Sequence, residues 1–297
     1  IIVGTSEGAL GTCCDFQSMI TEKGNASGSA FKFPNTVYNA AGGYLSICSG
    51  IKGYNVTVTN GAQSGLASMA YAMSVLRSGQ ENAMLATGSD ENSDTMTELF
   101  GKLGVTSENV VAPFAGKDGF VLSDGSASVL IEDEKAARER GARIYCHAAG
   151  YGMAHSNVKF GTLTGSEAGL TNAVNNALAD AGMTIDDIDA VFGFANGMKA
   201  VDDVEIKGLT AVFGDKLAEK PVVELKEVLG ESRAAAATTA AAHAALMFAG
   251  KIPSQEAYSI AADGSVSKTN VEASKLNNVL VVAYGAGGSY TAIVLSK

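Results

Sequence analysis

The chain has 297 residues, of which 46% are hydrophobic and 18% charged, a balance typical of a folded globular protein and not of a disordered one. Acidic residues outnumber basic ones by 31 to 21, and the net charge of −10 argues against nucleic-acid and anionic-membrane partners, which need clustered lysine and arginine. No run approaches the roughly 18 consecutive apolar residues that a membrane-spanning helix requires.

The four cysteines, Cys13, Cys14, Cys48 and Cys146, show no C-x-x-C spacing and no histidine at metal-ligand spacing. Reduced thiols in a cytoplasmic protein are therefore the simplest interpretation, and we expect neither a metal ion nor another cofactor. The chain opens on an apolar, β-branched run without the basic flank of a signal peptide. Because a domain seldom begins on an unflanked strand, we expect further elements of the fold to precede Ile1.

Strand-like runs alternate with stretches of helical length in the first half of the chain, and this alternation predicts a layered α/β architecture. Residues 118–132 predict two strands joined at an Asp-Gly turn, residues 124 and 125. The elements predicted before them are a strand over 1–4, a helix over 10–21, a strand over 55–59, a helix over 64–77 and a strand over 83–87.

The second half repeats this organisation. The alanine-rich residues 233–250 predict a buried central helix, since small side chains on every face allow close approach. Two hairpins that each close an α/β segment predict internal duplication, with an N-terminal half over 1–142 and a C-terminal half over 143–297. The other predicted elements are a helix over 134–140, a strand over 143–148, a helix over 167–181 that ends at Gly182, and strands over 279–283 and 291–295 around the glycine-rich loop 284–288.

Residues 53–65 predict a strand, a tight glycine turn and then the start of a helix. Enzymes place nucleophiles at such elbows, because the free N–H groups and the dipole of the helix stabilise an anion and lower the pKa of a thiol. Here the position carries Ala62, which has no nucleophilic atom, and the next residue is Gln63, a neutral amide.

This elbow resembles the nucleophile strand of β-ketoacyl-ACP synthases, which belong to the thiolase-fold family, with Ala62 at the position of the family's cysteine. Residues 33–43 (FPNTVYNAAGG) and 118–125 (DGFVLSDG) are similar to two further motifs of that family, and all the motifs follow the family's order. The resemblance implies an α/β fold: a thiolase-like layered α/β/α/β/α sandwich with internal duplication. The N-terminal part of its first half has no counterpart here.

The resemblance also places two histidine motifs, and neither histidine is present. Asn196 stands at the first, within a shortened loop, and Glu231 at the second, where the motif's lysine persists as Lys226. The gating phenylalanine of the family's C-terminal glycine loop corresponds to Ala286. Condensation requires a thiolate to hold the acyl chain and two imidazoles to stabilise the enolate formed on malonyl decarboxylation. We therefore expect no self-sufficient catalysis.

Within the family, this pattern resembles the chain-length factors of type II polyketide synthases, which pair with an active ketosynthase. The resemblance implies a non-catalytic subunit that binds a catalytic ketosynthase as a heterodimer and shapes the acyl tunnel. It also implies that the strand over 55–59 pairs across this dimer. Because the surface is acidic, we expect an acyl carrier protein to dock mainly on the partner.

The predicted helix over 10–21 lines the acyl tunnel in the resemblance. Leu10, Cys13 and Gln17 are spaced i, i+3, i+7 and share one helical face, and Ala286 would also face the tunnel. Leucine and cysteine obstruct less than aromatic side chains, which predicts a long, narrow tunnel suited to extended or polyene products. Ordinary core packing is an equally good interpretation of each of these residues.

Two alternative functions stay open. The chain would be a stand-alone malonyl-ACP decarboxylase if Gln63 and Asn196 supply the catalytic groups, although a structural turn residue is the simpler interpretation of Gln63. It would be a purely structural pseudoenzyme if it only stabilises its partner. The Asp202–Asp203 pair is most simply interpreted as solvated turn charges or helix caps.

Overall fold

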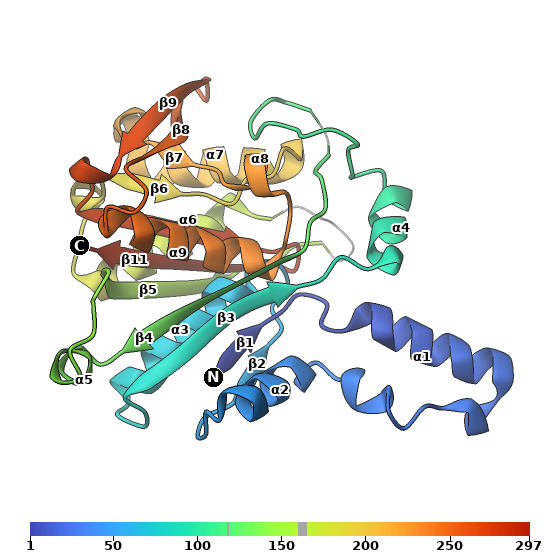
Figure 1. The fold of residues 1–297 in the computed structure, drawn as a ribbon. Helices are drawn as coiled ribbons and strands as arrows, with labels where there is room; N and C mark the ends of the chain where they lie inside the picture. Colours follow the sequence, from blue (N-terminus) through green and yellow to red (C-terminus); the bar gives the residue numbers. More distant parts are fainter. Residues whose placement is uncertain (118, 160–164) are drawn as a thin grey trace.

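The computed structural model describes residues 1–117, 119–159 and 165–297, which form two sheets with helices between and around them (Figure 1). The strands are β1 (Ile2–Gly4), β2 (Val56–Val58), β3 (Ala83–Asp90), β4 (Gly125–Glu132), β5 (His147–His155), β6 (Ala190–Phe192), β7 (Val222–Val223), β8 (Ser254–Ile260), β9 (Val266–Glu272), β10 (Asn278–Tyr284) and β11 (Ser289–Ser296). The helices are α1 (Leu10–Lys23), α2 (Ala40–Ser49), α3 (Ser64–Arg77), α4 (Asp94–Lys102), α5 (Glu134–Glu139), α6 (Glu167–Ala181), α7 (Lys199–Phe213), α8 (Lys226–Leu229) and α9 (Ala234–Phe248).

The two sheets repeat one arrangement of strands. The first sheet has the order β2-β1-β3-β4, in which β1 is parallel to both its neighbours and β4 is antiparallel to β3. The second has the order β5-β11-β10-β6-β7-β8-β9, in which β7, β6 and β10 are parallel and β11 is antiparallel to β10. The run β7-β6-β10-β11 thus has the connectivity of β2-β1-β3-β4, as an internally duplicated chain requires. The boundary at residues 142 and 143 stays a prediction.

The helices α3 and α9 lie between the two sheets (Figure 1). Six of the nine alanines of α9 are buried, so the prediction of a buried central helix is confirmed. A Cβ on Gly65 of α3 or on Gly88 of β3 would collide with the carbonyl oxygen of Ala234 at the start of α9. The small side chains therefore let a strand and two helices approach each other at backbone distance.

The outer faces are covered unequally. In Figure 1 the helix α6 lies behind the second sheet, on the side away from α9, and it packs on β5 and β11. On the first sheet the side chains of β1 alternate: Gly4 faces the start of α3, whereas Val3 faces Gly42 of α2. Helix α1 projects away from both sheets, and none of its residues is buried (Figure 1).

Two predicted strands differ from the structure. The prediction of a first hairpin strand within residues 118–132 is wrong. Asp118 lies outside the described residues, and Phe120 and Leu122 form only isolated β-bridges, with Thr106 and Glu231 respectively. This segment therefore joins distant parts of the chain, and β4 pairs with β3 instead. The strand predicted over 143–148 begins only at His147, because its antiparallel partner β11 pairs no further than Ser296.

The close packing around α9 can be tested at Gly88. Gly88→Ala should lower the free energy of unfolding by about 1–3 kcal/mol, because its Cβ would meet the Ala234 carbonyl and α9 would have to move. Gly101→Ala in α4 is the control: its Cβ would have no atom within 4 Å. Helix propensity predicts a gain of up to about 1 kcal/mol for the control. Urea unfolding measures both, and a Gly88→Ala protein as stable as the wild type would contradict the packing.

Candidate functional site

The elbow before α3 forms as the sequence predicts. Gly61 has a φ of +68°, and the turn is closed by Ser64, whose hydroxyl accepts from the N–H of Asn60 at 2.7 Å and donates to the Gly61 carbonyl at 2.6 Å. Ala62 lies between this turn and the first residue of the helix. The loop after β10 reaches the same place, since a Cβ on Gly285 would lie 3.6 Å from the Ala62 nitrogen. A methyl group thus occupies the nucleophile position of the elbow.

Three of the predicted site residues, Asn196, Lys226 and Glu231, form one buried cluster. Lys226 Nζ donates to Glu231 Oε2 at 2.8 Å, and the two side chains are only 5% and 6% exposed. Asn196 Nδ2 donates to the same oxygen at 2.8 Å, and the Arg233 N–H donates to Oε1 at 2.9 Å. Asn196 follows β6, Lys226 begins α8, and Glu231 lies between α8 and α9, so the cluster depends on three separate segments.

The cluster holds a fixed negative charge beside a fixed positive one. Burial disfavours the charged form of Glu231, yet Lys226, Asn196 and the Arg233 N–H outweigh it, and the pKa of this carboxyl is lowered. Lys226 Nζ also donates to the Phe194 carbonyl at 3.1 Å and lies 3.1 Å from the centroid of the Phe194 ring. Both charges are therefore compensated within the protein.

Asp202 is not a solvated charge as the sequence suggested, but a buried acceptor, 3% exposed. Its carboxylate accepts from the backbone N–H groups of Phe114 at 2.7 Å, Asn196 at 3.0 Å and Gly197 at 3.2 Å. Burial raises the pKa of Asp202 to about 6 in spite of these hydrogen bonds. Asp203 does face solvent, where it pairs with Lys199. Asp202 thus ties the loop around Phe114 to the segment that carries Asn196.

Two further carboxyl groups, Glu205 and Glu224, are buried beside the cluster and were not predicted. Both lie against Gly193, where a Cβ would collide with each of them. Glu205 Oε2 accepts from the Phe194 N–H at 2.7 Å and from the Tyr284 hydroxyl at 3.2 Å. Burial, followed by the charge of Glu205, raises the pKa of Glu224 well above its ordinary value. Burial therefore favours the protonated form of Glu224, while neither of its oxygens nor Glu205 Oε1 has a hydrogen-bond partner among the described residues.

Gln63, the residue after the elbow position, is fully buried. Its Oε1 accepts a hydrogen bond from the Thr291 hydroxyl of β11, whereas its Nε2 has no hydrogen-bond partner among the described residues. The side chain thus joins the elbow to the second sheet, while both N–H groups of its amide have no partner among the described residues.

The predicted tunnel residues lie elsewhere. Leu10 and Cys13 are half-buried and Gln17 is exposed, all on the projecting helix α1 (Figure 1). The Cys13 thiol donates to the Thr36 carbonyl at 2.9 Å. Ala286 is exposed in the loop between β10 and β11. None of the four residues is therefore fully buried in the isolated chain.

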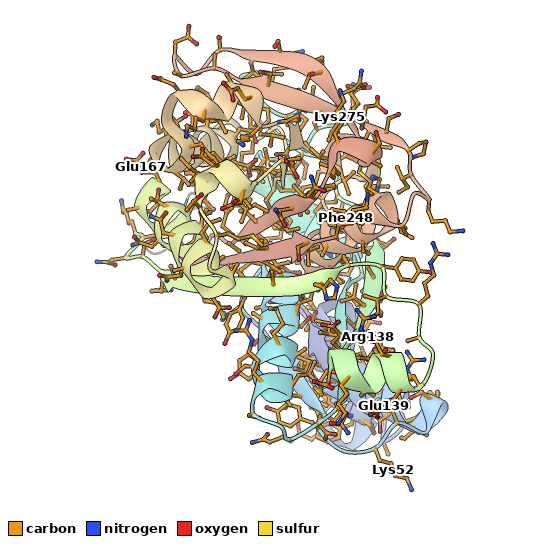
Figure 2. The ribbon with its side chains drawn as sticks, turned by 90° about the vertical axis from the view of Figure 1, so that its left-hand side faces the viewer. Lys52, Arg138, Glu139, Glu167, Phe248 and Lys275 are labelled. Carbon is orange, nitrogen blue, oxygen red and sulfur yellow. The ribbon has the colours of Figure 1, made fainter. Side chains whose placement is uncertain are left out.

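Two surface cavities are lined by none of the predicted site residues. Figure 2 labels three of the side chains that line them, Arg138, Phe248 and Glu167. One of about 440 Å³ is lined by residues that include Arg138 and Phe248, and one of about 450 Å³ by residues that include Glu167.

In the part of the chain that the structure describes, no group of His, Cys, Asp and Glu side chains is arranged to hold a metal ion. Among the same residues, no helix combines the length and apolarity needed to cross a bilayer.

The sequence is similar to one family over most of its length. Residues 1–137 match the family described as Beta-ketoacyl synthase, N-terminal domain, and residues 145–258 match Beta-ketoacyl synthase, C-terminal domain. The 3-oxoacyl-[acyl-carrier-protein] synthase 2 of Vibrio harveyi is 28% identical over 75% of this chain and 56% of its own length. A putative polyketide beta-ketoacyl synthase 1 of Streptomyces cyaneus is 27% identical over 83% of this chain and 61% of its own. The chain spans little more than half the length of such relatives.

Solved structures agree on the fold. The ishigamide ketosynthase/chain length factor superposes with a TM-score of 0.86 at 23% identity, over 100% of this chain and 75% of that one. The ketosynthase of AntDE:AntF, solved in complex with its type II PKS acyl-carrier protein, superposes with a TM-score of 0.86 at 19% identity. The match covers 99% of this chain and 77% of that one. These likenesses establish a thiolase-like fold with two mixed α/β sheets, as the resemblance implied.

The protonated Glu224 makes stability depend on pH. The folded protein keeps this proton where the unfolded chain has released it, so the free energy of unfolding falls as pH rises above 4.5. The slope reaches at most about 1.4 kcal/mol per pH unit. Glu224→Gln retains a donor but does not titrate, so its stability relative to wild type should increase between about pH 5 and about pH 8. Urea unfolding at the two pH values measures this. Glu272→Gln, at an exposed position of β9, is the control, and its stability should change with pH as that of the wild type does. If the stability of Glu224→Gln also changed with pH as the wild type's does, the raised pKa of Glu224 would be refuted.

Proposed function

Because the chain belongs to the β-ketoacyl synthase family, we propose that it is a chain-length-factor-like subunit without catalytic activity of its own, which pairs with a catalytic ketosynthase in type II polyketide biosynthesis. The observation that carries this proposal is the buried ion pair of Lys226 and Glu231 with the Asn196 amide bound to it. Asn196 and Glu231 stand where the family resemblance places its two histidines, and Ala62 stands at the position of its cysteine.

The chemistry of these side chains argues against condensation. Ala62 cannot hold an acyl group as a thioester. The Asn196 amide is used at both ends, because its Oδ1 accepts from the Met198 N–H at 3.1 Å while its Nδ2 binds Glu231. An enolate that formed beside the Glu231 carboxylate would meet a negative charge instead of an imidazole donor, which raises the barrier to decarboxylation.

One observation favours a second candidate, a malonyl-ACP decarboxylase that acts alone. The Gln63 Nε2 donor is fully buried and has no partner in the part of the chain that the structure describes, and such a donor could hydrogen-bond to a carbonyl oxygen. Against this candidate, the other required amide, Asn196, has its donor engaged with Glu231. Carbon dioxide release from malonyl-ACP by the isolated chain, absent in Gln63→Ala, would favour the decarboxylase over the non-catalytic subunit.

The surface around α2 fits a large apolar partner. Seven aromatic or aliphatic side chains between residues 31 and 51 are at least 40% exposed, and β2 beside them is an edge strand of its sheet. An edge strand with apolar neighbours favours pairing with another chain. We assign this face to the catalytic ketosynthase, with the acyl carrier protein docking mainly on that partner in the cytoplasm. The seven residues are Phe31, Phe33, Val37, Tyr38, Tyr44, Ile47 and Ile51.

The partner face is tested by a charge on α2. Ile47→Asp should weaken binding of the proposed catalytic ketosynthase partner at least about tenfold, because an unpaired carboxylate buried in the interface costs more than about 1.4 kcal/mol. Ile47 is 77% exposed, so the isolated chain should fold normally. Val228→Asp on α8, where the side chain is 79% exposed, is the matched control and should bind as the wild type does. Analytical ultracentrifugation of the mixtures decides, and equal affinities for all three proteins would contradict the assignment.

The chain-length role is tested at Cys13. In the reconstituted heterodimer, Cys13→Phe should shorten the polyketide product, because an aromatic ring on the Leu10, Cys13 and Gln17 face would obstruct the tunnel. Cys14→Phe is the control, since the next residue along α1 points about 100° away from that face. Mass spectrometry of the products gives the chain lengths. A lower yield with unaltered lengths would replace the chain-length role by that of a structural pseudoenzyme.

A further inference from the structure

Helix α1 carries the proposed tunnel face, yet it has little packing of its own. None of its residues is buried, and in Figure 1 it extends away from both sheets. Packing of an apolar face supplies most of the stability of helices in proteins, and α1 packs mainly on α4 and on the segment that follows it, with Phe16 against Phe33. Its orientation therefore depends in part on the loop of residues 5–9, which connects it to β1.

A buried carboxylate anchors this loop. Asp90, at the end of β3 and 5% exposed, accepts from the Thr5 hydroxyl at 2.6 Å and from the Ser6 N–H at 3.0 Å. Its other oxygen accepts from the Ala234 N–H at 2.9 Å, at the start of α9. One side chain thus holds the loop before α1 against the helix that follows Glu231.

Arg233 completes the connection in an unusual conformation. Its φ of +53° lies in the left-handed region that residues other than glycine rarely adopt, so its surroundings must hold it there. Its guanidinium is 3% exposed, with Nε 2.8 Å from Glu7 Oε2, and Nη2 donates to the Glu91 carbonyl at 2.7 Å. Its backbone N–H donates to Glu231. Arg233 thus binds the loop before α1 with its side chain and the Lys226–Glu231 cluster with its backbone.

We propose that Arg233 is a positioning residue that fixes the start of α1 relative to the Lys226–Glu231 cluster, and so sets the length of acyl chain that the tunnel admits. This inference rests on the proposed chain-length function. Glu7, the residue that Arg233 holds, precedes Leu10 by three positions, so a displacement of Glu7 passes directly to the tunnel face. Burial raises the pKa of Glu7, with the Ser6 hydroxyl and then the Arg233 charge opposing it. Without Arg233, Glu7 would lose both its ion-pair partner and one of the groups that oppose this rise in pKa.

The test uses the complex with the catalytic ketosynthase and two variants. Arg233→Met alone leaves the Glu7 carboxylate buried without a counter-charge, so the first variant is the double substitution Glu7→Gln with Arg233→Met, which removes both charges. The second is Arg233→Lys, which keeps the positive charge. A lysine ammonium lacks the planar, multi-donor guanidinium with which Arg233 contacts Glu7 and the Glu91 carbonyl at the same time. We expect both variants to shift the distribution of product lengths and to speed amide hydrogen exchange in α1. The double variant should shift the product lengths further than Arg233→Lys does.

The control is Arg77→Met. Arg77 Nη1 donates to both carboxylate oxygens of Asp180, at 2.9 and 2.8 Å, and this pair joins α3 to α6 without touching α1. Its loss should leave product lengths unchanged, so a shift in the Arg233 variants alone supports the proposal. If Cys13→Phe shifts product lengths and neither Arg233 variant does, the positioning role is wrong and the chain-length function stands. If none of these variants shifts them in an active complex, the chain-length function itself is wrong.

Discussion

The ion pair between Lys226 and Glu231 is the interaction on which the rest of the site depends. Each charge is buried, and removing one partner of such a pair typically costs 3–5 kcal/mol because the other is left uncompensated. The neighbouring groups follow from this constraint. Asn196 and the Arg233 N–H supply hydrogen bonds that the Glu231 carboxylate needs, and Phe194 offers its carbonyl and its ring to Lys226. A histidine in place of Glu231 would remove the carboxylate that lies 2.8 Å from Lys226 Nζ.

Close backbone packing puts these groups in place. Gly65 and Gly88 let α3 and β3 approach the first residue of α9, and the short segment from Glu231 to Ala234 must therefore turn sharply into the helix. Arg233 adopts a positive φ in that turn. The strain of this residue is offset by the contacts that it gains, which reach Glu7 on one side and Glu231 on the other. Packing density and electrostatics are thus coupled in one turn of the chain.

Local sequence patterns were sufficient for much of the fold and for part of the site. The helices over 64–77 and 167–181 have strong periodic patterns and end where expected, and the motif spacing brought Asn196, Lys226 and Glu231 together. The segment after Asp118 failed because its partners, near Thr106 and Glu231, are distant in sequence, so that no local pattern distinguishes it from a hairpin strand. The hairpin of β8 and β9 was missed because its exposed positions interrupt the apolar alternation.

The buried carboxyl groups show most clearly where a sequence pattern stops being informative. Asp202 and Glu205 lie three residues apart, on the face of α7 that also buries Leu209, and Glu224 continues the apolar run of β7. Their positions among buried residues were visible, but acidic side chains are assigned to solvent by default, and only the folded structure shows that Gly193 makes room for two of them. Burial raises the pKa of Glu224 and so favours its protonated form, and backbone N–H groups donate to the Asp202 carboxylate. This excess of acid supports the proposed non-catalytic role, because an anion that formed beside these groups would meet further acidic side chains.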